Sequence, residues 1–219
     1  PVAKNAPRRK ERWDLLDKYG YYPFDEIKGE SVSGPLEGAD GDWGAAEVAG
    51  MSADFVPVAR AIIGVKNLKI ITFGPRPQDF FACNAPIKGL YELGVEVEEN
   101  SELDLLVSYK AHKDDPRIES VCADMASELG VSGNRYPALL PRMAQFELTL
   151  LDWAEQHKGA RKYVAFADKC WPAFPEQFGF EPCYVNSRLA SRGIPVSCEV
   201  DIYGALSEYI GACASGGAV

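Results

Sequence analysis

The feature that most constrains the fold is an alternation of short β-rich runs with helical patterns from residue 68 to the end of the chain. The first run, Leu68–Phe73, stops at a Gly-Pro-Arg-Pro segment, and a helical pattern over 79–93 separates it from a second run over 95–98. This order predicts a βαβ unit with parallel strands and a right-handed crossover. Two further runs, 162–166 and 194–198, are each followed by a helical pattern. The sequence therefore predicts a doubly wound, mostly parallel, Rossmann-like α/β sheet with helices on both faces.

The beginning of the chain has a different character. Residues 1–44 combine a short charged helical pattern over 8–19 with a stretch rich in Gly, Ser and acids, which is typical of an arm or linker. Either one helix over 45–63 that is kinked at Pro57 or two short helices are expected to begin the α/β domain, which extends over 45–219. Because this leading segment buries little by itself, we expect it and the first helix to pack on another domain or subunit.

Composition excludes several kinds of partner. The 23 basic residues are outnumbered by 32 acidic ones, giving a net charge of −9, which argues against duplex nucleic acid and anionic membrane surfaces. No apolar run approaches the roughly 20 residues that span a bilayer. The six cysteines form no C-x-x-C pair, so a zinc knuckle or a thioredoxin motif is not indicated, and their apolar neighbours favour buried free thiols. With no signal peptide recognised, a reducing cytoplasm is the simplest compartment.

Polar and aromatic residues gather where three of the predicted strands end. Arg76 follows the first strand, Lys169 and Trp171 follow the third, and Glu199 follows the fourth. Ligands of open parallel sheets bind beyond the carboxyl ends of the strands, so these residues are candidates for one site. No glycine-rich phosphate motif and only two histidines are present, which argues against a nucleotide site, a Ser-His-Asp triad and a multi-histidine metal site.

Each candidate has two interpretations. Glu199 is suited to ligate a hard cation or to act as a general base, or else to form a strand-tip salt bridge. Lys169 is either a hook for a substrate oxygen or a solvated lysine, and Trp171 either walls a sugar face or belongs to the core. Arg76, between two prolines, is a fixed donor or a surface ion pair. Asp201 is placed to cap the last helix.

The same strand ends carry a resemblance to a known family. Residues 164–210, with Ala-Asp-Lys-Cys-Trp-Pro followed by Arg-Gly-Ile-Pro-Val-Ser-Cys-Glu-Val-Asp-Ile-Tyr-Gly-Ala-Leu, resemble the L-fucose isomerase and L-arabinose isomerase superfamily. The stretches Phe73-Gly-Pro-Arg-Pro-Gln-Asp-Phe80 and Leu90-Tyr-Glu-Leu-Gly-Val-Glu-Val97 resemble the first βαβ unit of that family's second domain. The likeness covers roughly residues 45–219.

The resemblance implies a metal-dependent aldose–ketose isomerase that uses Mn²⁺, or Mg²⁺, and assembles as a homo-oligomer, a hexamer or trimer. Glu199 falls on the family's metal-binding, proton-transferring glutamate. The family's second metal carboxylate and its histidine come later than residue 219, the histidine in a C-terminal β-barrel. On this basis the chain is expected to be a core fragment that lacks isomerase turnover by itself.

Two other classes of function stay open on the sequence. A non-catalytic sugar-binding or regulatory α/β module would use the same strand-end residues to hold a carbohydrate without reacting it. A nucleotide-binding domain is disfavoured by the missing glycine loop. Metal-dependent exchange of the proton at C2 of an aldose separates the isomerase from the binding module, because enediol formation removes that proton.

Overall fold

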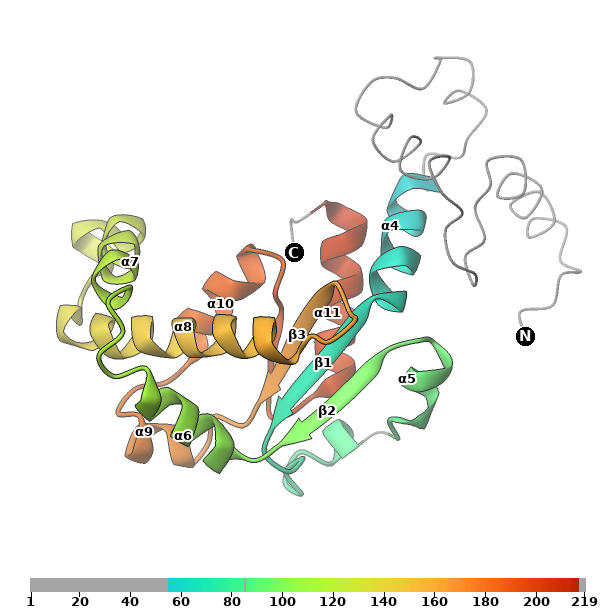
Figure 1. Cartoon of the computed structure of the whole chain (residues 1–219), viewed down its shortest axis with the longest axis horizontal. Helices are drawn as coiled ribbons and strands as arrows, with labels where there is room; N and C mark the ends of the chain where they lie inside the picture. Colours follow the sequence, from blue (N-terminus) through green and yellow to red (C-terminus); the bar gives the residue numbers. More distant parts are fainter. Residues whose placement is uncertain (1–54, 85, 217–219) are drawn as a thin grey trace, which may run out of the picture. The chain divides into compact units, whose positions relative to one another are not determined.

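The computed structural model describes residues 55–84 and 86–216 (Figure 1). The described chain falls into two units whose boundary lies between Ile63 and Gly64, inside helix α4 (Phe55–Lys66). The expected arm over 1–44, its helix over 8–19, the boundary at residue 44 and the beginning of the 45–63 helix lie outside the described residues. Within them, α4 includes Pro57.

From Gly64 onward the architecture is a four-stranded parallel sheet in the order β2-β1-β3-β4. The predicted strands are confirmed as β1 (Leu68–Phe73), β2 (Glu96–Asn100), β3 (Tyr163–Asp168) and β4 (Val196–Cys198). The register aligns their carboxyl ends, since Asp168 pairs with Phe73 on one side and with Cys198 on the other.

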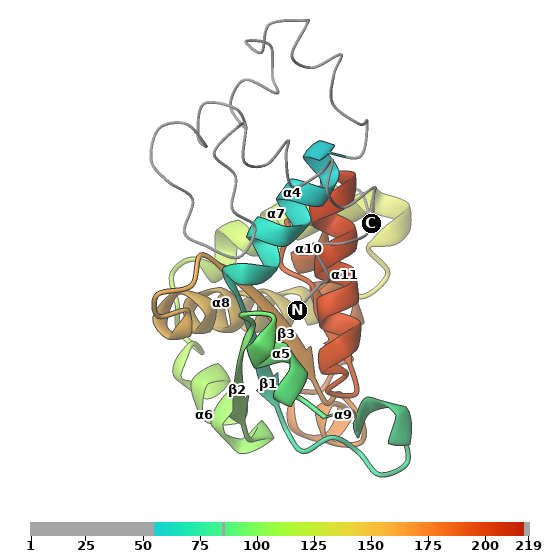
Figure 2. The same cartoon turned by 90° about the vertical axis from the view of Figure 1, so that its right-hand side faces the viewer.

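Helices cover both faces of this sheet, as predicted. Figure 2 shows the sheet close to edge-on, with α8 and α11 on opposite sides of it. The elements that connect and cover the strands are η1 (Phe81–Asn84), α5 (Lys88–Glu92), α6 (Glu102–Ala111), α7 (Ile118–Gly133), η2 (Pro137–Leu139), α8 (Leu140–His157), α9 (Ala173–Gln177), α10 (Cys183–Ser191) and α11 (Ile202–Ser215).

Two apolar layers hold these helices on the sheet. Side chains alternate along β1, so that Ile71 and Phe73 join the cluster beneath α6 to α10, whereas Leu68 and Ile70 join the cluster beneath α5 and α11. All six residues of β1 are buried, as expected for a central strand covered on both faces. The nearly continuous apolar run that predicted this strand is therefore the consequence of its two-sided burial.

Capping residues fix where two helices begin. Ser101 and Asp104 form a reciprocal capping box at the start of α6, and the side chain of Asp201 accepts a hydrogen bond from the Gly204 amide at the start of α11. The cap at Asp201 was predicted and is confirmed. The helix expected over 79–93 is wrong as a continuous element, because the chain forms the short turn η1 and then α5 on either side of Pro86. Proline lacks the amide that a continuous helix would need there.

The strand order places a topological switch point between β1 and β3. The chain leaves β1 towards β2 on one side and reaches β3 on the other, so the connections diverge at the carboxyl ends of these two strands. Ligands of open α/β sheets bind in the crevice that such divergence leaves. Among the described helices, none combines the length and the apolar character that a membrane crossing requires.

Candidate functional site

The centre of the candidate site is the turn that follows β4. Glu199 and Val200 both have left-handed backbone conformations, with φ of 57° and 55°. Two backbone hydrogen bonds hold the turn, from the Val200 amide to the Asp168 carbonyl and from the Asp201 amide to the Cys198 carbonyl, each of 3.1 Å. A left-handed conformation at a β-branched valine is strained, and such strain concentrates at functional sites. This turn therefore fixes Glu199 at the carboxyl edge of the sheet.

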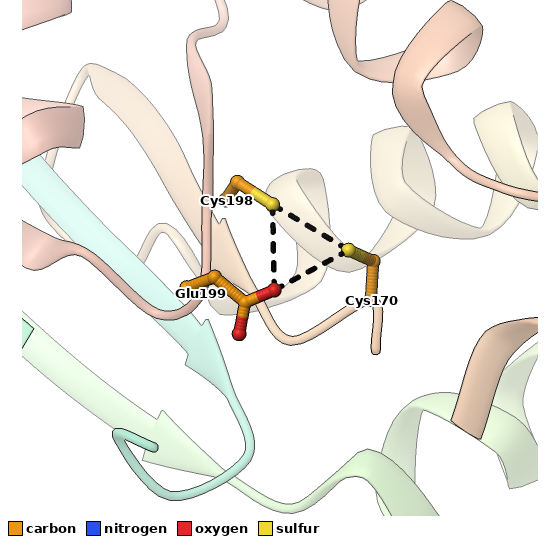
Figure 3. Close-up of side chains that lie close together, drawn as sticks. All are labelled: Cys170, Cys198 and Glu199. Carbon is orange, nitrogen blue, oxygen red and sulfur yellow. Dashed lines mark hydrogen bonds between the residues drawn. The ribbon is translucent and has the colours of Figure 1, made fainter. Parts of the chain in front are cut away.

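The Glu199 carboxylate lies beside two thiols that are close to each other (Figure 3). Its Oε1 is 3.6 Å from Cys170 Sγ and 3.7 Å from Cys198 Sγ, and the two sulfurs are 3.4 Å apart. Its Oε2 is buried and has no hydrogen-bond partner among the described residues. A buried carboxylate oxygen without a donor is costly, so this atom is suited to receive a cation or a substrate proton.

The two thiols differ in exposure. Cys170 is buried and Cys198 is exposed, so the prediction that the cysteines are buried holds for the first and is wrong for the second. Burial raises the pKa of the Cys170 thiol well above its ordinary value, and the neighbouring Cys198 and the carboxylates Asp168 and Glu199 act in the same direction. Desolvation also raises the pKa of Cys198. Without a bound cation, both side chains are therefore protonated at neutral pH.

Beneath the turn lies Asp168, the last residue of β3, which is wholly buried. Burial, together with the charge of Glu199, raises its pKa to about 7, whereas hydrogen bonding by Asn186 opposes the shift. Asn186 Nδ2 donates to both Asp168 oxygens, at 3.3 and 3.2 Å. Asp168 is therefore a positioning residue, because its backbone carbonyl and its side chain tie α10, β3 and the Glu199 turn together.

The raised pKa of Asp168 predicts a pH dependence of stability. The folded protein retains a proton on Asp168 up to about pH 7, whereas the unfolded chain releases it near its ordinary value of 3.8. Protonated Asp168 therefore contributes fully to the stability of the folded state below pH 3.8, and this contribution is lost as the pH rises through 7. Between about pH 5 and about pH 8 the wild-type protein is expected to lose about 2–3 kcal/mol of unfolding free energy through this group. Asp168→Asn keeps an acceptor for Asn186 and is expected to abolish this loss.

Urea unfolding of both proteins across that pH range measures this effect. The wild-type protein is expected to lose stability relative to the Asp168→Asn variant as the pH rises. Parallel pH profiles for the two proteins would show that Asp168 ionises as freely in the folded state as in the unfolded chain.

The predicted substrate-binding residues lie in the loops that follow β1 and β3. Lys169 Nζ is 3.6 Å from Glu102 Oε1, an ion pair that links the loop after β3 to the start of α6. Gly74, with φ of 105°, lies so close to Glu102 that a Cβ on it would be 2.9 Å from that carboxylate carbon. Trp171 is 59% exposed, so its interpretation as a core residue is wrong. Arg76 is half-buried in the loop after β1.

Sequence reasoning identified Glu199 and its segment but missed the roles of Cys170, Cys198, Asp168 and Asn186. The two cysteines are 28 residues apart in the chain and meet only because β3 and β4 are neighbours. Asp168 lies two residues beyond the predicted strand over 162–166, so its place as the buried last residue of β3 was not predicted. Asn186 gave no comparable signal, since it lies within α10 among ordinary helix residues.

Comparisons with known proteins add the chemical context. No protein-family model matches the chain. It is 30% identical over 157 residues to a sulfoquinovose isomerase of Priestia aryabhattai, covering 71% of this chain and 34% of that protein. Sulfoquinovose isomerases of Alkalicoccus urumqiensis and Clostridium sp. (strain MSTE9) are 30% identical over 148 residues and 31% identical over 151 residues.

These two matches cover 67% and 66% of this chain and 32% of each relative. The chain thus spans about a third of the length of the curated relatives that it matches. Their shared name places them among sugar isomerases, the class that the resemblance implied, whereas membership of the L-fucose and L-arabinose isomerase superfamily stays a prediction. Over the matched residues, the chain is a homologue of proteins named sulfoquinovose isomerase.

Proposed function

We propose that this chain is a core part of a metal-dependent aldose–ketose isomerase, with sulfoquinovose as the first substrate to test. The observation that carries the proposal is the Glu199 carboxylate, which a strained turn holds at the carboxyl edge of a parallel sheet, with one buried oxygen that has no hydrogen-bond partner among the described residues. The relatives support the same class of reaction, because all of those compared are named as sugar isomerases.

The chemistry of this reaction suits a carboxylate. Converting an aldose to a ketose removes the proton from C2, next to the carbonyl, and returns it to C1 of an enediol. Glu199 takes this proton and returns it on the neighbouring carbon, as a general base and then a general acid. A bound hard divalent cation supplies electrostatic stabilisation of the negative charge that develops on the two substrate oxygens.

The described residues fit Mn²⁺ or Mg²⁺ as a partial ligand set. These ions prefer carboxylate oxygens, and Glu199 offers an oxygen without a donor. The two neighbouring carboxylates are already engaged, Asp168 by Asn186 and Asp201 by the Gly204 amide. We therefore propose that the other ligands come from the remainder of a longer enzyme. By the resemblance, this enzyme is a homo-oligomer, and the free cysteines favour a reducing cytoplasm as its compartment.

Exchange of hydrogen at C2 tests the proposal directly. The enzyme that contains this chain is incubated with sulfoquinovose in deuterium oxide with and without Mn²⁺, and deuterium at C2 is followed by nuclear magnetic resonance. Metal-dependent exchange is the expected result. Saturable sugar binding without exchange would instead assign the chain to a binding module.

The loop residues are expected to act on substrate binding more than on chemistry. Lys169→Ala removes a cation from the site and Trp171→Ala removes an exposed aromatic face, so each variant is expected to raise KM by about tenfold, the effect of roughly 1.4 kcal/mol of lost binding. Steady-state kinetics measure KM and kcat separately. Lys169→Met, which also removes the charge but keeps the aliphatic stem, is expected to raise KM as Lys169→Ala does. A fall in kcat with unchanged KM would contradict the assignment.

A further inference from the structure

The side chains of Cys170, Cys198 and Glu199 converge on a single point between the ends of β3 and β4 (Figure 3). Each offers one ligand atom, and these atoms lie within 4.8 Å of one another. The site does not depend on local sequence spacing, since the first thiol comes from the loop after β3 and the other two groups from the end of β4 and its turn.

The triangle formed by these atoms has the dimensions of one face of a zinc tetrahedron. Tetrahedral zinc with Zn–S of about 2.3 Å and Zn–O of about 2.0 Å places two sulfurs about 3.8 Å apart and a sulfur and an oxygen about 3.5 Å apart. The corresponding separations here are 3.4 Å between the sulfurs and 3.6 and 3.7 Å from the sulfurs to Glu199 Oε1. Shifts of a few tenths of an ångström bring all three atoms to bonding distance.

The ligand types favour a thiophilic cation. Two sulfurs and one carboxylate suit zinc and its chemical relatives, whereas the hard ions Mn²⁺ and Mg²⁺ prefer oxygen throughout. Metal binding deprotonates the coordinating thiols. Three protein ligands also leave a fourth tetrahedral position, which water or a substrate oxygen can fill.

A second cluster of possible metal ligands differs from this one because a cation of the protein already lies beside it. His112, Asp115 and Asp152 also approach one another within 4.8 Å. The guanidinium of Arg117 already lies 2.6 Å from both carboxylates, so a cation is in place and the negative charge is compensated. Among the described residues, no Lys, Arg or His forms an ion pair with Glu199. The negative charge of the carboxylate beside the two thiols is therefore not compensated there.

We propose that Cys170, Cys198 and Glu199 form a binding site for a thiophilic divalent cation of the zinc class. A consequence rests on the function proposed above. Zinc held by the two thiols occupies Glu199 and thereby removes the carboxylate that isomerisation requires. The site then acts as a zinc-dependent inhibitory site, in which the cysteines bind the ion and have no part in the isomerase chemistry.

Direct binding tests the site without relying on any activity. The full 219-residue chain, kept reduced with a phosphine, is titrated with Co²⁺ as a spectroscopic probe and with Zn²⁺ in competition with a chromophoric chelator. We expect one equivalent of Co²⁺ to give thiolate-to-cobalt charge-transfer bands together with the strong visible bands of tetrahedral cobalt, and Zn²⁺ to displace it.

Three variants assign the ligands. Cys198→Ser changes an exposed thiol and is expected to keep the fold, as checked by circular dichroism, while weakening Zn²⁺ binding more than 100-fold, since loss of an outer-shell partner alone costs about 10–100-fold. Cys170→Ser is expected to do the same. Cys213→Ser is the control, because Cys213 lies eleven residues along α11 from Ile202, about 16 Å of helix away.

The outcomes separate the two proposals. Failure of the wild-type chain to show thiolate–cobalt bands, or equal Zn²⁺ affinity in the wild type and Cys198→Ser, overturns the metal site whatever the activity. Zinc binding without C2 exchange in the longer enzyme overturns the isomerase and leaves the site intact. Where both hold, Zn²⁺ is expected to inhibit exchange in the wild type and to lose this effect in Cys198→Ser.

Discussion

Replacing Glu199 by Gln is expected to lower the rate of C2 hydrogen exchange in the intact enzyme by about 10²–10⁴-fold, the usual effect of losing a general base. The amide has the shape of the carboxylate but neither accepts the C2 proton nor neutralises a cation. Weaker metal binding is expected to add to this loss. Exchange rates measured at saturating sugar and over a range of Mn²⁺ concentrations separate the two contributions.

Asp201→Asn is the matched control for this change. It removes a carboxylate two residues away but keeps a side-chain oxygen for the Gly204 amide, and Asn caps helices as well as Asp does. The control is therefore expected to retain near-normal exchange and stability. Near-normal exchange in Glu199→Gln would return Glu199 to a structural role, and a large loss in Asp201→Asn would move the catalytic carboxylate to that residue.

Removing the side chain of Arg188 is expected to produce the largest loss of stability. This side chain is 1% exposed and donates from Nε to Glu147 Oε2 and from Nη2 to Asp124 Oδ2, both at 2.7 Å, and also to Glu128. Arg188→Ala leaves the Glu147 carboxylate, which is also 1% exposed, without its buried partner. Breaking one side of a buried pair costs about 3–5 kcal/mol, which urea unfolding measures.

Two comparisons make this prediction specific. Arg192→Ala removes a side chain that is 43% exposed and contacts two of these carboxylates, those of Asp124 and Glu147, so it is expected to cost less than about 1 kcal/mol. Replacing Arg188 and Glu147 together by Met is expected to recover most of the loss, because no charge is then left buried. Equal losses for the Arg188 and Arg192 variants would contradict the role assigned to burial.

Much of the fold was predictable because local patterns and burial point the same way. The run Leu68–Phe73 carries apolar residues on both faces and predicted a strand of the parallel sheet, and the cap residue Asp201 marked the start of a helix. The helix over 79–93 was the exception. Its apolar spacing suggested one element, whereas the missing amide of Pro86 divides the segment into η1 and α5.

The sequence by itself determined that Glu199 follows a strand and belongs to the carboxyl edge of a sheet, since the strand pattern and its length place that residue there. Only the tertiary structure decided what surrounds it. The pairing of β3 with β4 brings Cys170 to 3.4 Å from Cys198, and full burial raises the pKa of Asp168 to about 7. Both facts depend on neighbours far apart along the chain. A pattern of residue types records which face of an element is apolar, but distances and desolvation arise only when the strands pair and the helices cover them.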